Sequence, residues 1–137
     1  RLIGSVSTGC IRKGSDIDLH VFTDSLESLE IALNKLQLIF ECRKISIRKN
    51  GKVFDYTHVY FQHVFSVELS VYPVNEQRTL SRSSTDGKPV KRLGTTALTQ
   101  RLMDEHPAMW NDYLSYGQVY IDRLISHVMS NVDYKWP

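Results

Sequence analysis

The sequence is poor in cysteine and has no long apolar run. Cys10 and Cys42 stand alone among 137 residues, without a CxxC pair and without a histidine at ligand spacing. This pattern favours two free thiols in a reducing compartment over a disulfide framework or a zinc site. No apolar stretch approaches the length that crosses a membrane, and no signal peptide precedes the first motif. We therefore predict a soluble cytoplasmic protein with no membrane partner.

The sequence also lacks a strong excess of charge of one sign. Seventeen Lys and Arg against fifteen Asp and Glu give a net charge of +2. This balance permits phosphate-bearing partners, but a basic stripe with interleaved aromatic residues is missing, so a nucleic-acid-binding domain is the weakest interpretation. An apolar content of 42%, with seven Tyr, five Phe and two Trp, indicates a globular chain rather than a disordered one.

The length of 137 residues suits one ordinary domain with a real core, and is too short for two. The chain starts at Arg1 without a methionine, and its first motif follows at once. We therefore expect a fragment or a processed protein. Elements before Arg1, or a partner subunit, would supply what is missing.

Alternation of polar and apolar residues predicts strands near the start of the chain. Residues 1–4 are expected to form a short strand that enters a turn at Gly4. Residues 16–21 alternate strictly, which is the period of a strand. One face of that strand is aliphatic, and the other carries Asp16 and Asp18.

A helix and three further strands are expected next. The elements are a helix capped by Asp24 or Ser25 that runs to about Cys42, and strands at about 43–48, 52–62 and 65–72. A broad apolar stripe indicates the helix. Asn50-Gly51 is a strong hairpin signal between the first two of these strands.

The composition changes after Pro73. Residues 78–92 are polar and rich in Ser and Thr, whereas a helical pattern begins near Thr95, breaks near His106 and resumes in a last helix from near Ser115. We predict an α/β (α+β) fold, with a small mixed sheet and flanking helices. Its parts are a core at 1–75, a polar linker at 76–94 and a helical C-terminal extension at 95–137.

The two aspartates predict a cation site. Asp16 and Asp18 share a strand face about 7 Å apart at the backbone, and convergent carboxylates need a proton or a cation. Oxygen ligands without Cys or His favour Mg²⁺ or Mn²⁺ over zinc. Glu68 is the preferred third carboxylate, because it faces away from the aliphatic side of its strand, and Asp55 is the alternative. His20 shares the aspartate face, where a structural role is favoured over a site role.

Taken alone, Ser-Asp-Ile-Asp favours a polar strand start with solvated aspartates. The upstream Gly4-Ser5 and the basic, Gly-rich segment between them shift the balance. A glycine permits close approach of the backbone to a phosphate, and the Ser5 hydroxyl can donate to one. Arg12 and Lys13 are as consistent with a solvated loop as with phosphate ligands.

The segment from Gly4 to Leu19 resembles the signature of the DNA polymerase β-like nucleotidyltransferase superfamily. It is most similar to the minimal bacterial and archaeal branch, whose pattern is Gly-Ser-x-Ala-x-Gly-x-x-Arg-x-x-Ser-Asp-Ile-Asp-Leu. The match has no gap and comprises Gly4, Ser5, Gly9, Arg12, Ser15, Asp16, Ile17, Asp18 and Leu19. Ser7 replaces the small alanine, and Thr8 stands where an arginine is common.

The resemblance implies a nucleotidyltransferase core that transfers a nucleoside monophosphate, AMP, from an NTP, ATP, to an acceptor with release of pyrophosphate. It implies two Mg²⁺ (or Mn²⁺) ions held by Asp16, Asp18 and Glu68, and phosphates held by Gly4, Ser5, Arg12 and Lys13. The acceptor, whether a small molecule, a protein or RNA, has no motif in the chain. A catalytically inactive nucleotide-binding or partner-binding module of the same fold is the alternative.

Overall fold

The computed structural model of the chain describes residues 1–49, 51–79, 82–83 and 87–117. The chain divides into two compact units, 1–95 and 96–137, which we describe separately. The helices of the first unit are α1 (Gly4–Thr8), α2 (Leu26–Lys35) and the 3-10 helix η1 (Val74–Arg78). Its strands are β1 (Ile17–Phe22), β2 (Phe40–Lys49), β3 (Lys52–Gln62) and β4 (Ser66–Tyr72).

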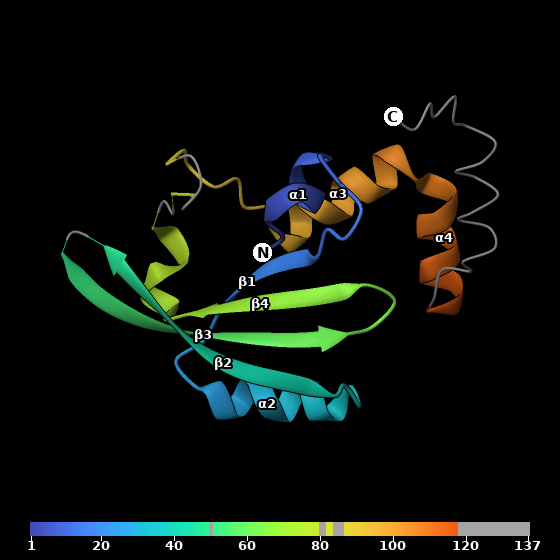
Figure 1. Cartoon of the computed structure of the whole chain (residues 1–137). Helices are drawn as coiled ribbons and strands as arrows, with labels where there is room; N and C mark the ends of the chain where they lie inside the picture. Colours follow the sequence, from blue (N-terminus) through green and yellow to red (C-terminus); the bar gives the residue numbers. More distant parts are fainter. Residues whose placement is uncertain (50, 80–81, 84–86, 118–137) are drawn as a thin grey trace. The chain divides into compact units, whose positions relative to one another are not determined.

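These strands form one mixed sheet in the order β1-β4-β3-β2 (Figure 1). Strands β1 and β4 are parallel, whereas β3 is antiparallel to both of its neighbours, β4 and β2. Parallel neighbours need a crossover connection, and here α2 and the β2–β3 hairpin provide it. The mixed sheet with its flanking helices confirms the predicted α+β class.

Helix α2 covers one face of the sheet and closes the core (Figure 1). The hydroxyl of Ser25 caps it by accepting a hydrogen bond from the backbone amide of Ser28 at 3.1 Å, as the sequence predicted. The buried cluster consists of Leu33, Val59, Val67 and Leu69. Side chains of β1 that pack against this cluster are Ile17, Leu19 and Val21. The predicted aliphatic face of β1 therefore lies toward α2.

Helix α2 ends earlier than the sequence predicted. It stops at Lys35 rather than near Cys42, because Gln37 has a left-handed backbone with φ of 56°. A right-handed helix cannot continue through that conformation. Leu38 and Phe40 pack against the core, while the residue between them is exposed, so this apolar stretch already has the period of a strand. The predicted C-terminal boundary of the helix was wrong.

The turn of the β2–β3 hairpin and strand β4 match their predictions, whereas β2 begins at Phe40, earlier than the predicted start near residue 43. Lys49 pairs with Lys52 beside the turn, and Gly51 has φ of 76°, which a glycine adopts without strain. Asn50 lies outside the described residues. Strand β4 ends at Tyr72, directly before the proline that was expected to terminate it.

The N-terminal residues pair with β1 at one position. Leu2 forms antiparallel bridges with Leu19 on one side and with Leu93 on the other. The expected strand is therefore a single bridged residue, and the expected turn is helix α1, which begins at Gly4. Gly9 closes that helix in the left-handed conformation, with φ of 76°. Leu93 thus holds the end of the predicted linker against the first unit.

In the second unit, α3 (Thr95–Glu105) and α4 (Pro107–Tyr116) are separated at His106, where the break was predicted. Gly117, with φ of 69°, caps the end of α4. The last predicted helix, from near Ser115, falls mostly beyond residue 117 and so outside the described residues. Across the described part of the chain, every helix is too short or too polar to cross a lipid bilayer.

Replacing Leu33 by alanine should destabilise the protein far more than replacing Ile31. Both residues lie on α2, but Leu33 is 5% exposed in the core and Ile31 is 48% exposed. Leu33→Ala leaves a cavity and should cost about 2–4 kcal/mol, whereas Ile31→Ala should cost roughly 0.5 kcal/mol. Urea unfolding followed by circular dichroism measures both, and equal losses would contradict the packing of α2.

Candidate active site

Gly4 lies against Asp18 because the residues before it are paired with β1. The backbone amide of Ile3 donates to the carbonyl of Asp18 at 2.9 Å, which fixes where the chain turns into α1. Gly4 has φ of 68°, and a Cβ built on it would collide with Oδ2 of Asp18. Both facts require glycine at this position. In this structure the backbone at Gly4 therefore lies close to a carboxylate of the same motif, and the approach to a phosphate stays a prediction.

Ser5 follows in the first turn of α1 and is half-buried. Its carbonyl accepts the hydroxyl of Thr8 at 3.1 Å and the backbone amide of Cys10 at 3.0 Å. Thr8, which replaces the arginine common at this position of the motif, therefore bonds within its own helix. It cannot provide the positive charge that an arginine would bring.

The loop between α1 and β1 is shaped by residues of the motif. Ser15 and Arg12 bind each other across a turn: the Ser15 hydroxyl accepts the Arg12 amide at 2.9 Å, and the Ser15 amide donates to the Arg12 carbonyl at 3.0 Å. Gly14, with φ of 81°, completes the turn. Arg12 and Lys13 are exposed on it. The turn therefore presents positive charge to solvent close to the start of β1.

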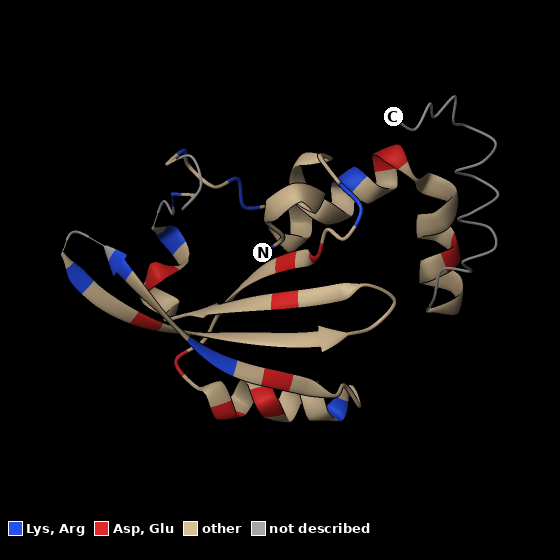
Figure 2. Cartoon of the chain, viewed as in Figure 1, with Lys and Arg blue, Asp and Glu red and all other residues tan. Residues whose placement is uncertain are grey.

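Strands β1 and β4 bring two of the three predicted carboxylates together. Asp18 pairs with Glu68 in the parallel register, and opposite residues share a sheet face. Figure 2 shows acidic residues in red on both β1 and β4. Asp16 is exposed and directly precedes β1. Asp55 lies on β3, which does not pair with β1, and accepts the hydroxyl of Ser46 at 2.6 Å.

The acidic pair is electrostatically strained. Burial raises the pKa of Asp18, and the negative charges of Glu68 and then Asp16 raise it further. Partial loss of water and like charges both disfavour the ionised carboxylate. A proton or a divalent cation between these groups relieves the repulsion, and oxygen donors are the ligands that Mg²⁺ prefers.

The donor types fit a divalent cation, but the side chains are not closed around one. Across the described residues, no group of three or more His, Cys, Asp or Glu side chains is arranged to hold a metal ion. Glu68 is paired with a histidine, and Asp16 lies at the exposed end of its loop. Gathering the carboxylates on one ion therefore needs rotation of Asp16, which solvent exposure leaves free to change rotamer.

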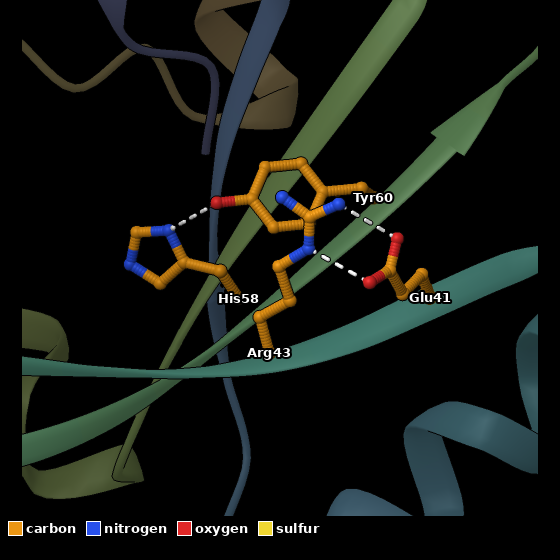
Figure 3. Close-up of polar contacts among 4 residues, drawn as sticks. All are labelled: Glu41, Arg43, His58 and Tyr60. Atoms are coloured by element: carbon orange, nitrogen blue, oxygen red, sulfur yellow. Dashed lines mark hydrogen bonds and ion pairs between the residues drawn. The ribbon is translucent and has the colours of Figure 1, made fainter.

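A polar cluster that the sequence reading missed adjoins Glu68. His58 Nδ1 lies 2.8 Å from Oε1 of Glu68, and the hydroxyl of Tyr60 lies 3.4 Å from the same nitrogen. The guanidinium of Arg43 lies over the ring of Tyr60, 5.0 Å from its centroid, and forms two 2.8 Å hydrogen bonds with Glu41 (Figure 3). Burial raises the pKa of Tyr60, and the charge of Glu68 adds to the increase.

The sequence contained a signal for this cluster. A two-residue turn fixes the register of a hairpin, so Lys49 opposite Lys52 places Arg43 opposite His58. Tyr60 on β3 lies opposite Glu41 on β2 and opposite Glu68 on β4. That row crosses the sheet through Asp18, Glu68, Tyr60 and Glu41.

His20 has the structural role that the sequence favoured. It is 5% exposed, its Nδ1 accepts Nε of Arg92 at 3.1 Å, and its ring lies 4.7 Å from that of Tyr72. Arg92 also donates to the carbonyls of Gln77 at 3.4 Å and Thr79 at 2.8 Å. This arginine ties the segment after η1 to the sheet.

A cavity of about 370 Å³ lies at the opposite end of β1 and β4. Its lining includes Thr23, Asp24, Tyr56 and Tyr72, together with Asp55, the alternative third carboxylate, and it contains neither Asp16, Asp18 nor Glu68. Asp24 accepts the amide of Val74 at 3.1 Å, so it serves the fold. We place the candidate site at Asp18 and Glu68 rather than in this cavity, because these two carboxylates are paired across the sheet and Asp18 belongs to the motif.

Comparison with known proteins gives no relative. No family model, no curated protein and no solved structure matches the chain. The assignment of a function therefore depends on the motif and on the geometry of the residues described above.

Gly4→Ala should destabilise the protein more than Gly9→Ala. Both glycines have positive φ, at 68° and 76°, so both substitutions carry the left-handed penalty of roughly 1–2 kcal/mol. A Cβ at position 4 also displaces the carboxylate of Asp18, whereas nothing lies within 4 Å of one at position 9. Chemical denaturation should show the larger loss for Gly4→Ala, with the difference reduced in an Asp18→Ala background. An equal loss in both variants would contradict the contact.

Asp18→Asn should stabilise the protein at neutral pH. Because the folded state raises the pKa of Asp18, the wild type loses stability as the pH rises through that pKa, and asparagine does not ionise. Solvent screening of this half-buried group limits the gain to about 1 kcal/mol. Thermal unfolding should show the gain at about pH 7 and its disappearance near about pH 3, where both side chains are neutral. A variant that is less stable than the wild type at neutral pH would contradict the repulsion.

Proposed function

We propose that the protein is a metal-dependent nucleotidyltransferase that moves a nucleoside monophosphate, AMP, from an NTP to an acceptor and releases pyrophosphate. The observation that carries the proposal is the pairing of Asp18 with Glu68, far apart in sequence, beside a glycine that only fits because it has no side chain. This is the arrangement expected if the Gly-Ser and Asp-x-Asp elements form one site. The raised pKa of Asp18 supports the same proposal, because a site built for cations repels itself without them.

The gapless match from Gly4 to Leu19 supports membership of the DNA polymerase β-like nucleotidyltransferase superfamily. The mixed sheet is compatible with it, since Asp-x-Asp stands at the start of one strand and the third carboxylate on a neighbouring strand. In this proposal residues 1–75 are the nucleotidyltransferase core, 76–94 are a polar linker and 95–137 are a helical extension. We place the protein in the cytoplasm, with a partner subunit completing the enzyme.

In the proposed reaction, a hydroxyl of the acceptor attacks the α-phosphorus. A bond forms from the acceptor oxygen to that phosphorus, and the bond from the phosphorus to the bridging β-oxygen breaks. Pyrophosphate leaves with the electron pair, and Glu68 assists by taking the proton of the attacking hydroxyl. Bound Mg²⁺ or Mn²⁺ would supply electrostatic stabilisation of the entering and leaving oxygens.

The chain's own residues have distinct tasks in this reaction. The ions would be held by Asp16, Asp18 and Glu68. Because these carboxylates repel one another when ionised, they bind either protons or cations, and the ions would displace the protons. Ser5 would donate its hydroxyl to a phosphate oxygen. Arg12 and Lys13 lie exposed on the adjoining loop, where they offset the negative charge of the triphosphate. Positioning and electrostatics would supply most of the rate gain, as in other phosphoryl transfers.

A second candidate is a nucleotide-binding or partner-binding module of the same fold without turnover. The observation that favours it is that no three potential ligands in the described residues are arranged around a common metal position. The identity of the acceptor, whether a small molecule, a protein or RNA, does not distinguish the two candidates. Metal binding without pyrophosphate release would indicate the module without turnover.

Incubation with each labelled NTP, Mg²⁺ and a mixture of small-molecule, protein and RNA acceptors should release pyrophosphate, most rapidly from ATP. Asp16→Asn, Asp18→Asn and Glu68→Gln should each reduce pyrophosphate release by about 10²-fold or more, because each replaces a negatively charged ligand of the metal ions by a neutral amide. Glu27→Gln, an exposed carboxylate in the first turn of α2, should retain the wild-type rate. ATP and Mg²⁺ binding by the wild type without any pyrophosphate would instead select the inactive module. Turnover that survives all three substitutions would exclude these carboxylates.

A further inference from the structure

Glu68 differs from the two aspartates in having a fixed partner on the next strand. Nδ1 of His58 on β3 lies 2.8 Å from Oε1 of Glu68 on β4. The side chain of His58 is 14% exposed and that of Glu68 is 26% exposed, so the pair is largely shielded from water. A hydrogen bond to a carboxylate at this depth is stronger than one at the surface. The orientation of Glu68 is therefore set by His58.

The geometry around His58 assigns the proton of its ring. A carboxylate only accepts hydrogen bonds, so Nδ1 must carry a proton to serve it. Nε2 is buried and has no hydrogen-bond partner within the described residues. Nδ1 is therefore the ring atom that binds Glu68, and Nε2 takes no part in the pair.

The ring of His58 is itself held in place. The ring of Tyr60 lies 6.2 Å from it, with the hydroxyl 3.4 Å from Nδ1 (Figure 3). The guanidinium of Arg43 lies over the ring of Tyr60 and is held there by two hydrogen bonds to Glu41. The support therefore runs across two strands from the exposed edge of the sheet to Glu68.

We propose that His58 is a positioning residue for the third carboxylate of the metal site, an inference that depends on the proposed function. By binding Oε1, it fixes the rotamer of Glu68 and leaves Oε2 for a divalent cation shared with Asp18. Metal-ligating carboxylates commonly have their other oxygen hydrogen-bonded in this way, and loss of the partner weakens binding. His58 touches neither substrate nor metal. Its contribution is the preorganisation of Glu68.

Two substitutions test which atom of the ring matters. His58→Asn places an amide near the position of Nδ1 and keeps a donor for Glu68, whereas His58→Gln carries its amide toward the position of Nε2. His63→Gln is the matched control, because His63 is exposed at the end of β3. Far-UV circular dichroism and thermal unfolding establish that each variant folds before any binding is compared.

Mn²⁺ binding measured by electron paramagnetic resonance, with a non-hydrolysable ATP analogue present, is the readout. His58→Gln should weaken the Mn²⁺ affinity by about 10-fold or more, His58→Asn by less than about 3-fold, and His63→Gln not at all. Long-range ¹H–¹⁵N spectra should show His58 protonated at Nδ1 in the wild type, with a shifted Nδ1 resonance in Glu68→Gln. Unchanged or tighter Mn²⁺ binding by His58→Gln would overturn the inference, as would an Nδ1 that carries no proton.

Failure of the inference and failure of the proposed function give different results. If the wild type binds Mn²⁺ and releases pyrophosphate while His58→Gln keeps full affinity, only the positioning role is wrong. If the wild type binds no Mn²⁺ with the ATP analogue, the proposed function is overturned together with the role of His58. An unfolded His58→Gln leaves His58→Asn as the deciding variant, since loss of affinity there despite a folded protein also overturns the assignment to Nδ1.

Discussion

The parallel pairing of β1 with β4 is the constraint on which the candidate site depends. Antiparallel neighbours can be joined by a short turn, but parallel ones require a long crossover. In this chain the crossover comprises α2 and the whole β2–β3 hairpin, and it sets Asp18 opposite Glu68. A slip of one residue in this register would send one of the carboxylates to the core face. The aliphatic residues of both strands that pack under α2 prevent such a slip.

The two faces of the sheet divide the work between stability and chemistry. The face toward α2 is aliphatic and carries the buried cluster around Val59. The opposite face carries one row of ionisable residues, which contains the carboxylates and Tyr60, and a second row that contains His20 and His58. Arg92 covers the second row at His20, and Gly4 lies against the first row at Asp18. The cost of holding like charges together at this partly buried pair appears in the raised pKa of Asp18.

Much of the fold could be predicted because period and turn chemistry act locally. The strand of Asp18, the hairpin at Gly51 and the end of β4 before its proline all follow from alternation and from residue types with strong backbone preferences. The end of α2 could not, because the same apolar stripe suits a helix or the start of a strand. The helix ends at Gln37, which has a left-handed backbone, and glutamine, unlike glycine, gives no indication of this conformation in a sequence.

The carboxylates of the site could be named from the sequence, but their surroundings could not. Glu68 follows from strand parity, whereas its partner His58 lies two strands from Asp18 and becomes visible only when the hairpin register is extended across the sheet. Helix α1 was missed because five residues carry too few periodic positions to indicate a helix. The contact of Gly4 with Asp18 depends on the pairing of Ile3 with β1, which is a tertiary feature.

The central claim is that Asp18 and Glu68 share a divalent cation. A crystal structure of the full chain with Mn²⁺ and a non-hydrolysable ATP analogue, examined for anomalous scattering at the manganese edge, tests it most directly. We expect a manganese peak within roughly 2.0–2.3 Å of a carboxylate oxygen of each residue, with the triphosphate on the same ion. An ordered site in which Asp18 and Glu68 bind no metal, or in which the metal lies elsewhere on the protein, would contradict the account.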